Sequence, residues 1–458
     1  MKTQNITQTV LFHHLAAKPI TVAMDQAHSS SDGGAILLQA LDRRADLTAS
    51  LASVIRDRRQ QGKISHTVEE ILRQRVFGIA LGYPDANDAN TLRHDPIHKL
   101  LAGRDPVRGD SIGSQSTLSR FENSVGRADL YRMGDALADQ VLAYHRRRLR
   151  GRCRRIFLDF DPTDDPTHGQ QEFSFFHGHY DTYCYLPLVG TIAFDGERDQ
   201  ALLCALLRPG RAAAHVGLIP ILRRLLPKIR RAFPRARICV RLDGGFGAPS
   251  VLDYLDSAKV DYVVGLGATQ PLKKKARRDM AAAKRRWRAT GRTVSVFGDT
   301  RYKTKTSWPH ARRVMWKAGI VEYPGREPKE NLRFVVTNLK CSPRRVYEIY
   351  RDRGDAENRI KELKNDLAMD RTSCSRFLAN QLRVLLTAAA YVLMQMLRWC
   401  ASDTDCRAAQ AGTLRGRLLK LAAWVQASAR RFVVHLPRDF PGRHTWNKIA
   451  VRLGAQPA

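Results

Sequence analysis

Short apolar segments alternating with amphipathic segments between residues 155 and 266 constrain the fold of this chain most. In chain order they are strand-like runs at 155–161, 183–194 (with a break at Gly190) and 200–207, a helix over 213–233, a strand over 237–243, a helix from about 248 and a strand over 260–266. Strands and helices mixed in this way predict an α/β layer with a mixed sheet.

The flanking regions predict a further organisation around this layer. Residues 1–150 read as a helical N-terminal DNA-binding region, with a capping box at Thr67 and Glu70. After the core's first part, 151–267, a basic helix and β-like runs at 293–297, 311–316 and 332–337 predict a β-rich insertion over 268–342. Residues 343–372 complete the core within a helix over 343–368, and 373–458, with helices to about 433, read as a helical C-terminal region for dimerisation or DNA contact.

The net charge of the chain limits the classes of molecule that it is expected to bind. There are 77 Lys and Arg against 44 Asp and Glu, a net +33, while 43% hydrophobic residues suffice for a core. A folded protein with this charge requires a polyanion, and three basic clusters at 146–155, 208–242 and 273–288 predict DNA contact. The longest apolar stretch, 384–397, is shorter than the roughly 20 residues of a spanning helix, so no membrane is expected. Eight cysteines without metal-binding spacing predict a reducing cytoplasm.

Two carboxylates follow two of the predicted strands. Asp161 ends the first strand and Asp243 ends the fourth. If those strands are neighbours, both side chains emerge at one edge of the sheet, where oxygen ligands could bind a hard divalent cation. A lone Asp at a strand end is more often a turn former or a helix cap. Asp159 and Asp164 lie close enough to compete for the role of Asp161.

A later helix offers a third carboxylate. At about 100° per residue, Tyr350, Arg353, Glu357 and Lys364 share a stripe roughly 60° wide. Such a stripe could bind a metal through the carboxylate and phosphates through the cations. The alternative for mixed charges on a helix is a solvated face.

These four residues fit the spacing Y-x2-R-x3-E-x6-K, which resembles the signature of bacterial insertion-sequence transposases of the DDE type. The contexts Asp161-Pro-Thr163 and Leu242-Asp-Gly-Gly-Phe246 also resemble that group, as do Arg73–Phe77, Gly82–Asp88 and His168–Gln171. The resemblance covers residues of about 30 to 400. It implies a ribonuclease H-like core with a mixed five-stranded sheet, flanking helices and a β-rich insertion.

The resemblance also implies a function. Asp161, Asp243 and Glu357 would be the catalytic residues and the ligands of two Mg²⁺ ions, for which Mn²⁺ can substitute. Expected DNA contacts are Tyr350, Arg353, Lys364, Lys273, Lys274, Lys275, Arg285 and Arg286. Trp308 or Trp316 would stack on a flipped base, although a packed core tryptophan is the alternative.

The implied enzyme is a cut-and-paste transposase. It would cleave double-stranded DNA at terminal inverted repeats, commonly through a hairpin, and join the ends to target DNA. It would act as a homodimer on paired ends in the bacterial cytoplasm, at the nucleoid. The alternatives are a ribonuclease H-like nuclease without strand transfer and a non-catalytic DNA-binding regulator derived from a transposase.

Overall fold

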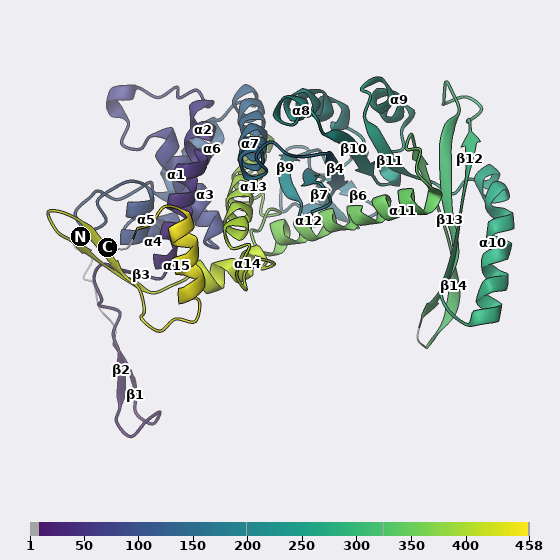
Figure 1. The fold of residues 1–458 in the computed structure, drawn as a ribbon. Coiled ribbons are helices and arrows are strands. Elements are labelled where there is room, and N and C mark those ends of the chain that lie inside the picture. Colours follow the sequence, from purple (N-terminus) through teal and green to yellow (C-terminus); the bar gives the residue numbers. More distant parts are fainter. Residues whose placement is uncertain (1–8, 198, 324, 457–458) are drawn as a thin grey trace. The chain divides into compact units, whose positions relative to one another are not determined.

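A computed structural model describes residues 9–197, 199–323 and 325–456 (Figure 1). The chain folds as two compact units. The central unit comprises Ala45–Arg58 and Phe121–Gln395, and the terminal unit comprises the residues up to Arg44, Arg59–Arg120 and the residues from Met396 onward. Each unit thus combines segments that are distant in sequence.

One eight-stranded mixed sheet forms the centre of the central unit. In spatial order its strands are β12 (Val294–Tyr302), β13 (Arg312–Tyr323), β14 (Arg326–Thr337), β11 (Asp261–Leu266), β10 (Arg237–Leu242), β4 (Arg155–Pro162), β8 (Leu188–Phe194) and β9 (Ala201–Leu206). Strand β10 runs parallel to β4 and β11, and the other neighbouring pairs are antiparallel. The predicted α/β architecture with a mixed sheet is confirmed, and the sheet is wider than the five strands expected.

The additional width comes from the insertion. Strand β14 pairs with β11 from Val263↔Thr337 to Leu266↔Phe334, so the insertion continues the core sheet. Its strands are longer than the predicted runs, and in β14 only the half nearest the core is buried. The outer half of β14 is exposed and charged. A strand pattern based on burial therefore misses the outer half.

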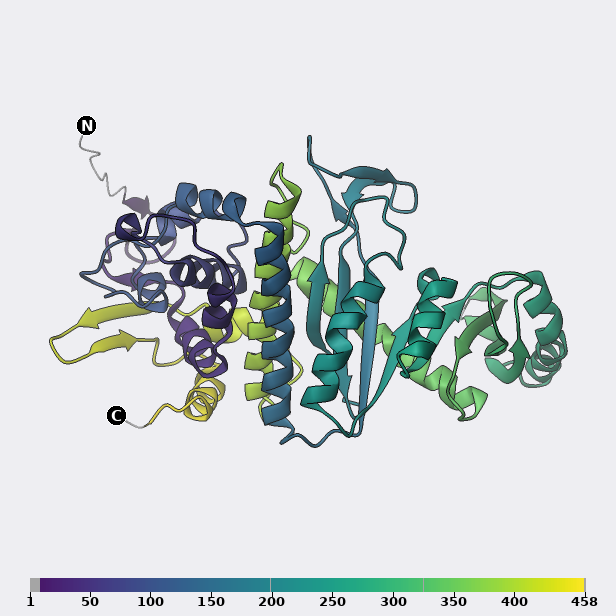
Figure 2. The ribbon, with the colours of Figure 1, turned by 90° about the horizontal axis from the view of Figure 1, so that it is seen from above.

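The central unit also contains helices. They are α2 (Leu47–Ser53), α7 (Arg127–Arg148), α8 (Leu218–Ala232), α9 (Pro249–Ser257), α10 (Gln270–Thr290), α11 (Pro343–Arg351), α12 (Asp355–Asn365) and α13 (Phe377–Cys400). Helices α7 and α13 lie side by side in both ribbon views (Figure 2). By length and composition α13 could cross a membrane, but 89% of its most apolar window is buried inside the protein, as expected of a core helix.

Side chains of α13 close the free edge of the sheet at β9. Gln395 accepts a hydrogen bond from the Leu202 N–H (2.9 Å) and donates one to the Gln200 carbonyl (2.7 Å). Gln381 accepts from the Leu207 N–H at 2.7 Å. An open edge strand is a template for unwanted pairing, and these two glutamines satisfy part of it.

A small second sheet follows β4, with the order β5 (Asp165–Pro166), β7 (Thr182–Tyr185), β6 (Phe175–His177). The predicted strand 183–194 is therefore two strands that separate at Pro187, which lacks a backbone N–H. Gly190 does not end the strand, but the expected irregularity is present there, because the pairing of β8 with β9 shifts register between Gly190 and Thr191. Gly190 lies inside β8, where a Cβ atom would come within 2.6 Å of Phe160.

The terminal unit is mainly helical in its N-terminal part. Its helices are α1 (Ile36–Ala45), α3 (Val68–Ala80), α4 (Ala89–Leu92), α5 (Pro96–Leu101), α6 (Gln115–Ser124), α14 (Ala411–Leu414) and α15 (Arg443–Arg452). The capping box of Thr67 and Glu70 is confirmed. Strands β1 (Val10–Phe12) and β2 (Ile20–Val22) form a separate hairpin.

The expectation of helices to about residue 433 is wrong. Residues 423–435 contain the hairpin β15 (Ala423–Ala427) and β16 (Phe432–His435), and β15 also pairs with β3 (Ser29–Ser30). The cause is an alternation of buried and exposed side chains along β15, with β-branched residues facing it in β16. This period of two favours a strand over a helix.

Candidate functional site

Asp161 and Asp243 lie at the same edge of the sheet, on neighbouring strands. The parallel register of β4 and β10 pairs the residues directly before them. Asp243 also caps a short 3-10 turn by accepting a hydrogen bond from the Gly245 N–H at 2.9 Å. The turn passes so close to β11 that a Cβ at Gly265 would lie 2.7 Å from the Gly244 nitrogen. Glycine therefore permits the approach that places Asp243.

The third carboxylate reaches this edge from α12, but the predicted continuous helix over 343–368 is wrong. Tyr350 lies in the last turn of α11, and Arg353 lies in a 3-10 turn over Asp352–Gly354. Glu357 and Lys364 lie on α12. Gly354 disfavours a continuous helix at this point. The stripe nevertheless reaches the site, because Arg353 Nη1 lies 2.8 Å from Asp161 Oδ2 and its Nη2 lies 3.6 Å from Glu357 Oε1.

The pKa of Asp161 reflects both its burial and the charges around it. Burial raises the pKa of Asp161 to about 6, although the Arg353 guanidinium opposes this shift. The charges of Asp243 and Glu357 raise the pKa further. A like charge acts in this way only at short range, so Asp243 and Glu357 both lie near Asp161.

The two competing aspartates have other partners. Asp159 is 1% exposed and forms a two-point ion pair with Arg241, at 2.7 Å (Nε–Oδ1) and 2.5 Å (Nη2–Oδ2). Arg241 also donates to the Ile349 carbonyl at 3.1 Å, which ties α11 to β10. Asp164 accepts from Lys364 Nζ at 2.9 Å. Asp161 is thus the carboxylate of this segment that faces Asp243 and Glu357.

The site fits a hard divalent cation by its donor chemistry. Its candidate ligands are all carboxylate oxygens, as Mg²⁺ prefers. Among the described residues, no group of three or more His, Cys, Asp or Glu side chains is already drawn together around one point. The Arg353 guanidinium instead bridges Asp161 and Glu357, so cation binding requires Arg353 to move away from Asp161.

The predicted basic helix exposes its cations. Helix α10 packs through a buried stripe of Leu272, Ala276, Met280 and Ala283. The rest of its surface carries the side chains expected to contact DNA, all of them exposed: Lys273, Lys274, Lys275, Arg285 and Arg286. The one acidic residue of this helix, Asp279, accepts a hydrogen bond from Trp316 Nε1 at 2.8 Å. The outer face therefore carries positive charge that the helix itself does not neutralise.

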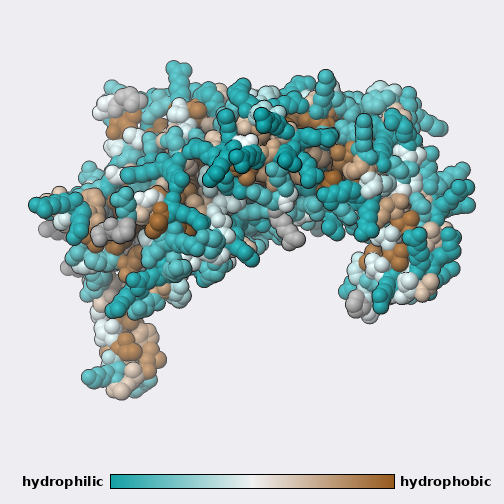
Figure 3. Space-filling model, viewed as in Figure 1, coloured by the Kyte–Doolittle hydropathy of each residue, from teal (hydrophilic) through white to brown (hydrophobic). Residues whose placement is uncertain are grey.

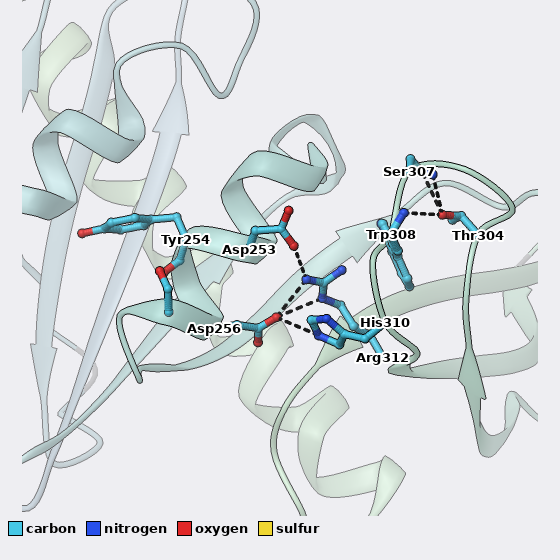
Figure 4. Close-up of polar contacts among 9 residues, drawn as sticks. Asp253, Tyr254, Asp256, Thr304, Ser307, Trp308, His310 and Arg312 are labelled. Atoms are coloured by element: carbon cyan, nitrogen blue, oxygen red, sulfur yellow. Dashed lines mark hydrogen bonds and ion pairs between the residues drawn. The ribbon is translucent and has the colours of Figure 1, made fainter.

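The two tryptophans proposed to stack on a base are buried in this structure. Trp308 is 4% exposed and Trp316 is 6% exposed. Trp308 lies beside Arg312, which forms ion pairs with Asp253 (2.6 Å) and Asp256 (2.9 Å) (Figure 4). Both rings match the alternative of packed core tryptophans, and neither face is open to a nucleobase.

Tyr180, which the sequence did not single out, also lies near the carboxylates. It occupies the turn between β6 and β7. Burial raises its pKa, and the charges of Asp164, Asp161 and Asp243 add to the shift. In the sequence Tyr180 is a tyrosine between two predicted strands, and nothing there indicates that it lies near the carboxylates.

A second basic feature lies at the other ends of the core strands, where β4 and β10 begin. The end of α7, just before β4 begins, and the end of α8, just before β10 begins, line a groove. Its charged residues are Arg146, Arg147, Arg150, Lys228, Arg231 and Asp139. Asp139 forms an ion pair with Lys228 at 2.6 Å, which leaves an excess of arginines along the groove.

The known proteins to which this chain is similar are transposases. A family model described as "Transposase DDE domain group 1" matches residues 12–458. A solved structure described as the cryo-EM structure of a piggyBac transposase synaptic complex with hairpin DNA is similar, with a TM-score of 0.43 and 10% identity, over 98% of this chain and 85% of that chain. No curated protein matches the chain.

Proposed function

Because the chain belongs to the transposase DDE domain group 1 family, and is therefore a DNA-cutting transposase, we propose that Asp161, Asp243 and Glu357 form its catalytic centre. The observation that carries this proposal is geometric: Asp161 and Asp243 lie at the same ends of two neighbouring parallel strands, and Arg353 bridges Asp161 to Glu357. The charges of Asp243 and Glu357 also raise the pKa of Asp161. Structural ion-pair networks also shift pKa values. Here the shift occurs at the strand ends where α/β folds bind ligands.

The topology supports a ribonuclease H-like core for this enzyme. The strand order β9-β8-β4-β10-β11, with β8 antiparallel to its neighbours and β10 and β11 parallel to β4, is the order expected of that core. The insertion enters after β11 and returns before α11. Together with the Tyr350, Arg353, Glu357 and Lys364 spacing, this supports the bacterial insertion-sequence group.

The proposed chemistry is phosphodiester cleavage followed by strand transfer. A water oxygen attacks phosphorus at the transposon end, the bond to the 3′ oxygen breaks, and the strand leaves with a 3′-hydroxyl. That hydroxyl then attacks a phosphorus of target DNA and displaces another 3′ oxygen. Two Mg²⁺ ions held by Asp161, Asp243 and Glu357 would supply the positive charge that in-line displacement requires.

Arg353 and Lys364 would position the DNA backbone. Both cations are now paired with carboxylates, Arg353 with Asp161 and Lys364 with Asp164. Cations held near the site in this way can transfer to phosphate oxygens when DNA and metal arrive, because metal ions then neutralise the carboxylates. The exposed face of α10 would extend this contact along the duplex.

We also propose a homodimer formed through the β1–β2 hairpin. One face of this hairpin consists of the cross-strand pairs Val10–Val22 and Phe12–Ile20, whose side chains are 41–45% exposed. Figure 3 shows brown, hydrophobic atoms along the hairpin. An isolated two-stranded hairpin is marginal in water. An apolar face does not suit DNA, whereas the same face of a second copy would cover it symmetrically.

The dimer proposal can be tested without DNA. Sedimentation equilibrium of the full chain should show dimers that weaken at least ten-fold in Phe12→Asp. Thr21→Asp is the matched control, since it adds the same charge on the other face of the hairpin. A wild-type monomer at every concentration, or equal weakening in both variants, contradicts a dimer through this face.

The catalytic proposal is tested with DNA carrying the inverted repeats that flank the gene. With Mg²⁺ or Mn²⁺ the wild-type chain should cut and join the ends, and Asp243→Asn should bind the DNA but not cut it. Asp253→Asn is a control, because its carboxylate pairs with Arg312. Binding without cutting by the wild type favours a regulator, and cutting without joining favours a plain nuclease.

A further inference from the structure

The β6–β7 ribbon presents two exposed aromatic rings. Phe176 is 53% exposed and Tyr183 is 59% exposed. The two residues are directly opposed in the antiparallel register, so both side chains project from the same face of the ribbon. Their ring centroids are 5.6 Å apart in an edge-to-face arrangement. The pair forms a small apolar platform in contact with solvent.

The opposite face of the ribbon is held in place. Phe175 and Cys184 form the next cross-strand pair, and Cys184 is fully buried. The Arg211 guanidinium lies 4.3 Å from the centroid of the Phe175 ring. The exposure of Phe176 and Tyr183 therefore follows from an anchored two-faced ribbon. Two adjacent, solvent-exposed aromatic rings offer an apolar contact surface to a ligand.

The platform is directly linked to the catalytic edge. Strand β4 carries Asp161, and β5 of the small sheet begins three residues after β4 ends. The Thr167 N–H donates to the Tyr183 carbonyl at 2.9 Å, which connects the segment after β5 to the platform strand. The turn between β6 and β7 carries Tyr180, whose pKa responds to Asp161 and Asp243. Figure 2 shows the small sheet at the end of the core strands.

We propose that Phe176 and Tyr183 bind unpaired nucleobases of the DNA strand at the active site by stacking. This inference rests on the proposed function, which brings a cut DNA strand to this edge of the sheet. Taking a base out of the stack costs a few kcal/mol, and stacking on an aromatic ring can offset part of that cost. An aromatic face accepts any base, so the platform would bind single strands without sequence preference. It takes the role that the sequence suggested for Trp308 and Trp316, whose rings are buried.

The test compares single-stranded and double-stranded DNA. Fluorescence anisotropy would measure binding of a labelled oligothymidylate of about 15 nucleotides and of a duplex of the same length, in buffer without divalent metal. The double variant Phe176→Ala/Tyr183→Ala should bind the single strand on the order of ten-fold more weakly, and the duplex within two-fold of wild type. Tyr183→Phe keeps the ring and should retain binding.

Two controls make the outcome decisive. Tyr323→Ala removes another exposed aromatic ring of the central unit, on β13, and should leave binding unchanged. Tyr183→Leu keeps an apolar side chain without a ring and should bind as weakly as Tyr183→Ala. Single-strand binding that survives the double variant, or that is lost in Tyr323→Ala, overturns the proposal.

Failure of the platform is distinguishable from failure of the proposed function. Asp243→Asn should bind the oligothymidylate as wild type does, because stacking needs no catalytic carboxylate. If the double variant binds normally while Asp243→Asn abolishes cutting, the platform is wrong and the catalytic assignment holds. If the double variant loses binding while Asp243→Asn still cuts, the reverse is true.

Discussion

Replacing Asp165 by asparagine is expected to stabilise the central unit at alkaline pH. The Asp165 side chain is fully buried and accepts hydrogen bonds from Thr372 Oγ1 at 3.0 and 2.9 Å. Burial raises the pKa of Asp165 to about 7, the Thr372 hydrogen bond lowers it, the charges of Asp370 and Asp164 raise it, and Lys364 lowers it. The folded protein thus prefers the neutral carboxyl, which asparagine imitates.

The sign and size follow from linkage. The pKa of Asp165 is higher in the folded state than the ordinary 3.8. The folded state therefore binds the proton more tightly, and stability falls as the pH rises from about 4 through about 7. This difference in pKa between the folded protein and the ordinary value lowers the free energy of unfolding by about 4 kcal/mol when the carboxylate is fully ionised. Between pH 5 and pH 8 the cost grows by about 2.5 kcal/mol.

The assay is urea unfolding followed by tryptophan fluorescence at pH 5 and pH 8. The stability difference between Asp165→Asn and wild type should grow in favour of the variant by about 2.5 kcal/mol from pH 5 to pH 8. Asp164→Asn is the matched control, since it removes a neighbouring carboxylate that pairs with Lys364 in a partly exposed site. A difference for Asp165→Asn that does not change with pH would refute the reasoning.

Three further predictions concern other contacts. Arg241→Met should cost roughly 3–5 kcal/mol of stability in urea unfolding, because it leaves buried Asp159 unpaired. Adding Asp159→Leu should recover most of this loss. If Arg241→Met is as stable as wild type, the prediction is wrong. Trp316→Ala should destabilise by roughly 3–5 kcal/mol, and an intact melting temperature would show that its ring is not packed. Reversing Arg146 and Arg231 to Glu should make the salt dependence of duplex binding shallower by about two phosphate contacts, whereas an unchanged slope excludes the α7–α8 groove from DNA binding.

The strands that carry Asp161 and Asp243 were predictable because they are short apolar runs bounded by charged residues. The same reasoning failed where burial changes along one element. Only the inner half of β14 is apolar, so the sequence suggested a short strand. Gly354 interrupts the helix that places Glu357, although the side chains still converge. The positions of Trp308 and Trp316 in the sequence could not show whether their rings stack on a base or pack in the core. The structure shows that both rings are buried.

The pairing of β14 with β11 has a mechanical consequence. Hydrogen bonds run without interruption from the strands beneath α10, through β14 and β11, to β10, which ends directly before Asp243. A sheet of this kind resists bending in its plane far more than a linker does. DNA gripped by the exposed face of α10 would then be held at a fixed span from the carboxylates. This fixed distance would set the position of the cut, which would vary little from one molecule to the next.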